Sequence, residues 1–376
     1  MIVAGEASGD LHGANLVREA MKLDPDLCFF GIGGPRMREA GVETLVDSSR
    51  MAVVGLVEVL SHSGVISHAY LTLRRILGTD PPDLLILIDY PDFNLRIARL
   101  AKGAGIRVLY YISPQVWAWR VGRVRKIGQV VDRMAVVFPF EVPFYEKEGV
   151  PVTFVGHPLV DTIHPSMSRD EGAKFFGLDP NRQTIGLFPG SRRGEIRKLL
   201  PVILESARLL KERFPAAQFI LPLAPGLDRQ EIEQQLRLSG LEVTIAEGQV
   251  YDVIQLCDAI ISVSGTVTLE IALMGVPMVI IYRVSPLTYE IGKRVVKVDH
   301  IGLCNIVAGE RVVAELIQDE AEPVSIAGEI GRILTDPAYA AGIRSRLASV
   351  RGKLGSGGGA ARVARLALSM LSDGEN

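Results

Sequence analysis

The stretch LLILIDYPDFNLRIARLAKGAGIRVLYYIS, residues 84–113, decides the fold class. It opens with an apolar run that predicts a strand over Leu84–Asp89, and it continues with a segment that predicts a helix over Phe93–Ala104. A second apolar run predicts another strand over Val108–Ile112. A strand, a helix and a strand in this order predict two parallel strands joined by a right-handed crossover.

The same alternation runs through the rest of the chain. Apolar runs predict further strands at Met1–Ala4, Cys28–Gly31, Met134–Phe138, Thr153–Val155, Thr184–Phe188, Phe219–Leu223, Val243–Ala246, Ala259–Val263 and Met278–Tyr282. Amphipathic stretches predict further helices at Gly13–Leu23, Val65–Leu77 and Val121–Val131, with others between the later strands. We therefore expect an α/β protein of two doubly wound, Rossmann-like domains that face a cleft.

The boundary between the two domains is predicted near Gly156–Gly172. This stretch contains two prolines and several polar residues without periodicity, as is typical of a linker. We expect an N-terminal domain over residues 1–160 and a C-terminal domain over 161–355, which suits a length of 376 residues. Apolar residues at helical spacing after a glycine-rich break predict a last helix over 360–372, and packing back on the first domain would bury its apolar face.

Composition excludes several classes of protein. Lys and Arg number 41 against 43 Asp and Glu, so a net charge of -2 gives no support to nucleic-acid binding. A hydrophobic share of 48% supplies a sizeable core and argues against disorder. The cysteines Cys28, Cys257 and Cys304 lie far apart, so they predict neither a disulfide framework nor a cysteine zinc site and fit a reducing compartment. Neither a secretory signal nor a membrane span is expected.

Ligands of open α/β sheets bind at the carboxyl ends of the strands, so the residues there are the first candidates for a site. Asp89 ends a central apolar strand, where partial burial suits a general base; a structural hydrogen-bonding role is the alternative. Asp92 lies just before a helix and is interpreted as its N-cap. The two aspartates lack an obvious third ligand, so we expect no metal.

Two further strand ends of the first half are candidates for contact with a substrate. The turn GEASGD places Ser8 and Gly9 where a substrate can approach backbone amides, although an ordinary turn capped by Ser8 or Asp10 is equally compatible. The loop SPQVWAWR carries Gln115 and Arg120, which are further candidates for contact with a substrate.

A basic cluster continues from that loop through Arg120, Arg123, Arg125 and Lys126. This cluster is compatible with a solvated helix face that has no binding role. The more specific interpretation is that it binds an anionic partner, such as a substrate phosphate or acidic lipid. The apolar segment Met51–Leu77 leaves a similar choice between core packing and contact with an acyl chain or a membrane surface.

The second domain has two strand ends that suit phosphate. One strand ends in PGSR, which places Arg192 at a helix start, and another ends in Ser264, Gly265 and Thr266. Glu270, one turn further on, suits the two hydroxyls of a ribose. Each motif alone also fits an ordinary capped helix, but two in one domain favour binding of a nucleoside diphosphate. The chain has no Gly-Lys-Ser/Thr P-loop, which excludes ATP hydrolysis of that type.

Taken in chain order, these motifs resemble bacterial lipid-A-disaccharide synthases. The matching segments are VAGEASGD at 3–10, GGPRM at 33–37, VVGLVEVL at 53–60, IDYPDFN at 88–94, SPQVWAWR at 113–120, VGHPLVD at 155–161, LFPGSRRGE at 187–195, SGTVTLE at 264–270 and LCNIVAG at 303–309. By these matches Asp89 falls on the family's candidate base, Arg192 on its diphosphate-binding arginine and Asn305 on a functionally important asparagine, which we place with the nucleotide-binding residues. The resemblance also leads us to assign Ser8, Gly9, Gln115 and Arg120 to binding of the acceptor sugar. Tyr90 and Gln115 depart from the family's pattern.

The resemblance implies a metal-independent, inverting glycosyltransferase of the GT-B fold that needs no cofactor. Such an enzyme joins UDP-2,3-diacylglucosamine to 2,3-diacylglucosamine 1-phosphate (lipid X) and releases a β-1,6-linked tetraacyl disaccharide 1-phosphate and UDP, in lipid A biosynthesis. The resemblance also implies a cytoplasmic enzyme that associates peripherally with the inner membrane surface.

Two rival functions stay open at this point. A UDP-GlcNAc 2-epimerase also uses two such domains, but it has no need of the apolar segment Met51–Leu77. A non-catalytic sugar-nucleotide or lipid-binding module has no need of Asp89. The oligomeric state, a homodimer included, is left open by the sequence.

Overall fold

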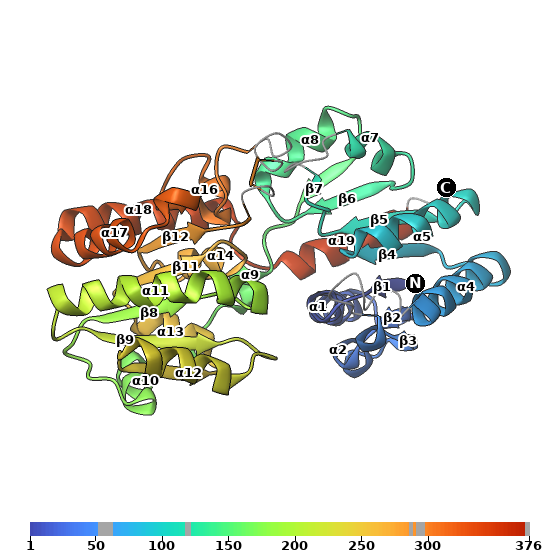
Figure 1. Cartoon of the computed structure of the whole chain (residues 1–376). Helices are drawn as coiled ribbons and strands as arrows, with labels where there is room; N and C mark the ends of the chain where they lie inside the picture. Colours follow the sequence, from blue (N-terminus) through green and yellow to red (C-terminus); the bar gives the residue numbers. More distant parts are fainter. Residues whose placement is uncertain (52–62, 117–121, 286–288, 291–297, 373–376) are drawn as a thin grey trace. The chain divides into compact units, whose positions relative to one another are not determined.

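The chain forms two compact units, each an α/β fold around a parallel sheet. Unit 1 comprises Met1–Asp161 and Leu354–Asn376, and unit 2 comprises Thr162–Lys353. A computed structural model (Figure 1) describes residues 1–51, 63–116, 122–285, 289–290 and 298–372. Both units have the doubly wound architecture expected from the alternation of strands and helices, so the predicted fold class is confirmed.

The sheet of unit 1 has seven parallel strands in the order β3-β2-β1-β4-β5-β6-β7. The strands are β1 (Ile2–Ala4), β2 (Phe30–Gly33), β3 (Glu43–Asp47), β4 (Leu84–Ile88), β5 (Arg107–Tyr111), β6 (Arg133–Val136) and β7 (Val152–Phe154). The helices are α1 (Ala7–Leu23), α2 (Pro35–Glu39), η1 (Ser48–Arg50), α4 (Ser63–Thr79), α5 (Pro91–Gly103), α7 (Arg123–Gly128), η2 (Pro139–Glu141), α8 (Val142–Glu146) and α19 (Gly359–Ser372).

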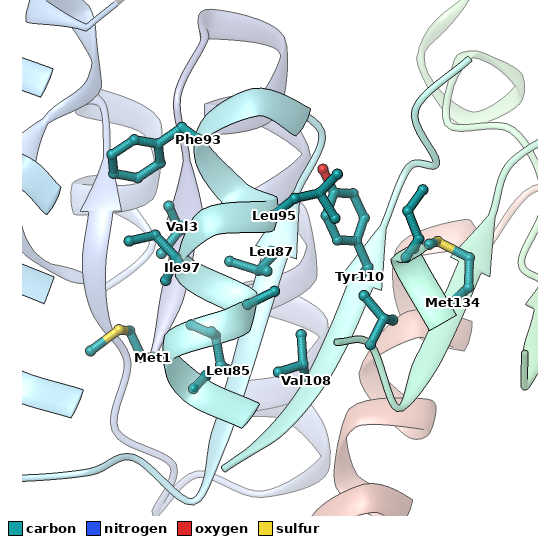
Figure 2. Close-up of a cluster of buried hydrophobic side chains, with 14 of the residues drawn as sticks. Met1, Val3, Leu85, Leu87, Phe93, Leu95, Ile97, Val108, Tyr110 and Met134 are labelled. Atoms are coloured by element: carbon teal, nitrogen blue, oxygen red, sulfur yellow. The ribbon is translucent and has the colours of Figure 1, made fainter. Parts of the chain in front are cut away.

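Alternation along the strands of unit 1 builds its core. Successive side chains of a strand point to opposite faces of the sheet. Figure 2 shows Leu85 and Leu87 of β4 together with Val108 and Tyr110 of β5, packed against helix α5. Helix α4 packs on α5 over this face. The other face is covered by α1 and α19, which contact each other and β4.

The sheet of unit 2 has six parallel strands in the order β10-β9-β8-β11-β12-β13. The strands are β8 (Thr184–Phe188), β9 (Gln218–Leu223), β10 (Val243–Glu247), β11 (Ala259–Val263), β12 (Met278–Tyr282) and β13 (Ala314–Ile317). The helices are α10 (Arg169–Phe176), α11 (Arg193–Arg213), α12 (Arg229–Ser239), α13 (Val250–Leu256), α14 (Val267–Leu273), α16 (Leu303–Ala308), η3 (Gln318–Glu320), α17 (Pro323–Thr335) and α18 (Pro337–Lys353). A short helix, α9 (Leu159–Thr162), spans the change of unit.

The strand order reverses once in each sheet, between β1 and β4 in unit 1 and between β8 and β11 in unit 2. Connections leave in opposite directions at such a point, which opens a crevice beyond the carboxyl ends of the two strands. The residues that follow these four strands therefore hold the best positions for binding.

The chain crosses between the units twice, and the crossings are joined on the side of unit 1. Asp161 accepts hydrogen bonds from the amides of Gly358 (2.8 Å) and Gly359 (3.3 Å), just before and at the start of α19. The Leu354 carbonyl accepts from the His157 amide at 2.9 Å. Helix α19 thereby returns to unit 1, where it lies against α1.

The boundaries of several elements differ from the sequence expectation. The second strand begins at Phe30 rather than Cys28, and the edge strands β3 and β13 were not expected because neither is a continuous apolar run. Helix α1 begins at Ala7 rather than Gly13, so the glycine turn is only Gly5–Glu6.

Asp10 therefore lies inside the first turn of α1, and its carboxylate caps a different helix. It is buried and accepts hydrogen bonds from the amides of Gly34 (2.6 Å), Arg36 (3.0 Å) and Met37 (3.0 Å), at the start of α2. The alternative in which Asp10 caps its own helix is wrong, because the N-cap of α1 is Glu6.

We predict that Asp10→Ala lowers the free energy of unfolding by about 1.5–3 kcal/mol, since the amides lose a charged acceptor and stay buried. Chemical denaturation followed by circular dichroism measures the change. Asp80→Ala, at an exposed position in the same unit, serves as the control with little expected effect. Equal stability of the two variants would contradict the capping role.

Candidate functional site

The carboxyl end of β4 makes a strained turn that aims Asp89. Asp89 and Tyr90 both have left-handed backbones, with φ of 46° and 48°. Each such non-glycine residue costs on the order of 1–3 kcal/mol, and strain of this kind persists only where its surroundings enforce it. Here the enforcing contacts come from Asn94 of α5 and Tyr110 of β5. Asn94 Nδ2 donates to the carbonyls of Ile88 (3.1 Å) and Asp89 (2.7 Å), and the Tyr110 hydroxyl donates to the Asp89 carbonyl at 2.6 Å.

The Asn94 side chain makes these contacts although one of its own polar atoms is left without a partner among the described residues. Its side chain is fully buried, and among the side chains that the structure describes its Oδ1 is the buried polar atom without a hydrogen-bond partner. An unpaired buried acceptor is unfavourable, so the position of the amide is explained by the two carbonyls that its other end holds. The sequence motif alone did not single out Asn94 or Tyr110.

The Asp89 carboxyl has the electrostatics of a general base. Burial, and secondly the charge of Glu6 at the end of β1, raise the pKa of Asp89 to about 6. A carboxylate with this pKa is ionised at neutral pH and still basic enough to accept a proton. Close packing sets the surroundings: a Cβ on Gly5 would lie 2.4 Å from Cδ1 of the Tyr90 ring, so glycine is required there.

Asp92 is not the N-cap of α5. Tyr90 occupies the cap position and Pro91 begins the helix, so Asp92 lies inside the first turn. Its largely exposed carboxylate pairs with Arg123 at 2.8 Å. That ion pair links α5 to α7 at the surface. Arg123 of the basic cluster is therefore already paired with a carboxylate.

The residues assigned to acceptor binding differ in their exposure to solvent. Ser8 and Gln115 are exposed. Gly9 is buried instead, where a Cβ would lie 3.2 Å from Cβ of Ala4, so close packing of α1 on β1 explains this glycine. Arg120 lies outside the described residues.

In unit 2 a pocket of about 310 Å³ lies at the point where the strand order reverses. It is lined by Arg192, Gly194, Glu195, Lys198, Leu199, Val263, Ser264, Tyr282, Arg283 and Val284. Three of these side chains are cations and one is a carboxylate, so the lining suits an anion. Arg192 is 76% exposed at the N-cap of α11 and pairs with Glu195 at 2.9 Å. Lys198 and Arg283 are members of the pocket that the motif did not reveal.

The second motif of unit 2 follows β11. Gly265 and Thr266 are exposed just before α14, and their carbonyls accept from the Thr268 (3.1 Å) and Leu269 (2.9 Å) amides of its first turn. Ser264 differs from them, because its amide donates to Ile281 O (3.2 Å) and its hydroxyl donates to Ile301 O (2.9 Å). Burial raises the pKa of Glu270, the carboxylate one turn further on.

Asn305 has no exposed surface, so the expectation that it touches the nucleotide needs correction. Its Nδ2 donates to Val313 O (3.0 Å) and to Glu315 Oε1 (2.8 Å). Its Oδ1 accepts from the amides of Val312 (2.9 Å) and Val313 (3.1 Å). Both donor hydrogens and both acceptor positions are occupied, so no group of this side chain is left for a ligand.

The segment Met51–Leu77 lies partly outside the described residues, from 52 to 62. In α4, Ala69, Leu73 and Leu77 belong to the buried core, so core packing is confirmed for this stripe. Leu71 is 58% exposed on the same helix. None of the helices in the described stretches is long and apolar enough to cross a membrane.

Comparison with known proteins identifies the family. The family model for lipid-A-disaccharide synthetase matches residues 1–341. A lipid-A-disaccharide synthase of Geobacter sulfurreducens is 71% identical over 371 residues, which cover 99% of this chain and 97% of that protein.

Solved structures share the fold at low identity. A UDP-GlcNAc 2-epimerase from Neisseria meningitidis bound to UDP-GlcNAc has a TM-score of 0.68 at 14% identity, covering 98% of this chain and 99% of its own. The calicheamicin glycosyltransferase CalG4 has a TM-score of 0.59 at 17% identity, covering 99% and 97%. These likenesses establish the two-domain architecture, whereas the family rests on the much closer sequence match. The chain belongs to the lipid-A-disaccharide synthases, glycosyltransferases that join UDP-2,3-diacylglucosamine to 2,3-diacylglucosamine 1-phosphate.

Proposed function

We propose that Asp89 is the general base of this reaction, taking the proton from the 6-hydroxyl of the acceptor sugar. The observation that carries the proposal is the half-buried carboxyl with a pKa of about 6 at the end of β4, held by a strained turn. A neutral hydroxyl is a poor nucleophile, and its attack on an anomeric carbon is faster when a positioned base removes its proton. Glu6 supports this role, because its negative charge favours uptake of the proton by Asp89.

The same proposal places UDP in the pocket of unit 2. The departing diphosphate gains negative charge in the transition state, and preorganised cations stabilise such charge. Arg192, Lys198 and Arg283 supply cations at the pocket, and the exposed turn at Gly265 and Thr266 supplies amides. Arg192 exchanges its ion pair with Glu195 for the diphosphate, and Glu270 accepts hydrogen bonds from the ribose hydroxyls.

The two alternative functions, a 2-epimerase and a non-catalytic binding module, have less support. The 2-epimerase structures resemble this chain at 13–15% identity, which is evidence for the fold alone, while relatives at 47–71% identity are lipid-A-disaccharide synthases. A non-catalytic binding module gains nothing from a strained turn that holds a carboxyl of raised pKa. Base catalysis explains that feature directly.

We place the enzyme at the inner membrane surface, where its acylated substrates reside. Leu71 on α4 is an exposed apolar side chain, and Arg125 and Lys126 on α7 are exposed cations. Acidic headgroups attract each nearby cation with about 1 kcal/mol, and salt screens that attraction. The net charge of -2 gives no general attraction, so the contact is local.

We predict that Asp89→Asn lowers kcat by about 10²–10⁴-fold, because asparagine keeps the shape of the side chain but cannot accept a proton. In the wild-type enzyme kcat rises with pH through a midpoint near 6, since only the ionised carboxylate acts as a base. Steady-state rates of UDP release from pH 4.5 to 8 measure both effects.

Asp92→Asn is the matched control, since it changes the neighbouring carboxylate at an exposed position. It should keep kcat within a few-fold of wild type. A folded Asp89→Asn enzyme with near-normal turnover, beside an inactive Asp92→Asn, would move the base to Asp92.

We predict that Arg192→Ala weakens UDP binding by about 10–100-fold, the loss that follows from removing a charge-assisted hydrogen bond. Glu270→Ala should weaken it as well. Titration calorimetry with UDP measures both. Arg193→Ala, which removes an adjacent exposed cation outside the pocket lining, is the control. Wild-type affinity in both Arg192→Ala and Glu270→Ala would show that UDP binds elsewhere.

We predict that Leu71→Asp, and separately Arg125→Ala with Lys126→Ala, reduce binding to vesicles containing acidic phospholipid. Flotation at low and high salt measures it, and high salt should weaken wild-type binding. Leu238→Asp changes a leucine that is 82% exposed in unit 2 and serves as the control. Absence of the wild-type protein from vesicles at both salt concentrations would leave core packing as the whole role of α4.

A further inference from the structure

Unit 2 contains a buried carboxylate that the proposed function does not use. Glu315 of β13 is 6% exposed. Its Oε2 accepts a hydrogen bond from the Ile301 amide (3.0 Å), and its Oε1 accepts from the Gly302 amide (2.9 Å) and from Asn305 Nδ2 (2.8 Å). No cation of the described residues pairs with it. Among the described residues, three N–H groups are therefore what compensates this charge.

Such an arrangement is costly for stability alone. Removing an ionised carboxylate from water is unfavourable, and apolar residues of similar volume often fill such a site at lower cost. The carboxylate does something that an apolar side chain cannot do: it fixes the positions of two consecutive backbone amides. The Glu315 side chain thus fixes the backbone of the loop at Ile301 and Gly302.

Asn305 extends the same anchor. It joins Glu315 to the backbone of Val312 and Val313, the segment that leads into β13. On its other side the loop packs closely on β12, since a Cβ on Gly302 would lie 2.3 Å from Cδ1 of Ile280. Glu315 and Asn305 therefore connect the edge strand, helix α16 and the loop before it.

The loop reaches the nucleotide pocket through one hydrogen bond. The Ile301 carbonyl accepts the hydroxyl proton of Ser264 at 2.9 Å, and Ser264 lines the pocket. A hydroxyl has one proton and two lone pairs. With the proton committed to Ile301, Ser264 offers only lone pairs to the pocket, so it can accept a hydrogen bond but has no proton to give to a phosphate oxygen.

We propose that Glu315 and Asn305 are positioning residues for the donor site: they hold the Ile301 carbonyl so that Ser264 accepts a hydrogen bond from a hydroxyl of the bound UDP-sugar. The inference rests on the proposed placement of UDP in this pocket. It also revises the expected role of Ser264, from a phosphate donor to an acceptor for a sugar hydroxyl. Asn305 then supports nucleotide binding without touching the nucleotide.

A double-mutant cycle tests the proposal in the full-length protein. Titration calorimetry with the UDP-sugar in the absence of acceptor, and KM for the UDP-sugar, are measured for Ser264→Ala, Glu315→Gln and the double variant. Each single change should weaken binding about five- to tenfold, as expected for one lost hydrogen bond. The double variant should lose no more than the stronger single, because both changes remove the same contact. Ser264→Thr, which keeps the hydroxyl, should retain affinity.

The control pairs Glu315→Gln with Asp89→Asn of unit 1, for which the effects should be independent. Independent effects of Ser264→Ala and Glu315→Gln would overturn the proposal. So would unchanged affinity of Ser264→Ala, a variant that leaves the buried anchor intact and so decides the matter even if Glu315→Gln does not fold. Arg192→Ala separates failure of the pocket assignment from failure of the positioning role. If Arg192→Ala leaves UDP binding unchanged, UDP does not bind in this pocket. If Arg192→Ala weakens binding and the other variants do not, only the role of Glu315, Asn305 and Ser264 fails.

Discussion

The hydrogen bonds that Asn94 and Tyr110 donate to the Asp89 carbonyl are the interaction on which the site of unit 1 depends. A parallel strand that ends in extended backbone would carry Asp89 onward in the direction of β4. The left-handed turn reverses this course within two residues and starts α5 at once. The strain is tolerable because both donors are buried in the core, where competing water is absent. The packing of the core therefore also sets the geometry of the proposed base in this unit.

In unit 2 the backbone around the pocket is positioned by a different kind of contact. Its backbone is held at the pocket by a buried carboxylate and an amide, Glu315 and Asn305, rather than by a strained turn. In both units the asparagine is fully buried and hydrogen-bonded to backbone groups. The side chains proposed to meet substrate, Asp89 and Arg192, are more exposed than the residues that hold their surroundings. Rigid support beneath a less buried reactive group is what preorganisation requires.

The sequence predicts the strands well because a strand buried on both faces is a continuous apolar run, as in Leu84–Ile88. It also locates Asp89 and Arg192, since each directly follows such a run or begins a helix. The roles of Asn305 and Glu315 escape it, because their partners depend on how β13 and the loop at Ile301 pack in space. The same limit explains Asp10, which caps a helix some 24 residues away along the chain.

The charges of the two sites are opposite, and the reaction explains why. Glu6 beside Asp89 makes the acceptor region of unit 1 electronegative, which favours removal of a proton from a hydroxyl. The pocket of unit 2 carries three cations against one carboxylate, which favours a leaving group that gains negative charge. Unit 1 thus carries the proposed base and unit 2 the proposed cations, so each unit supplies one half of the chemistry that we propose.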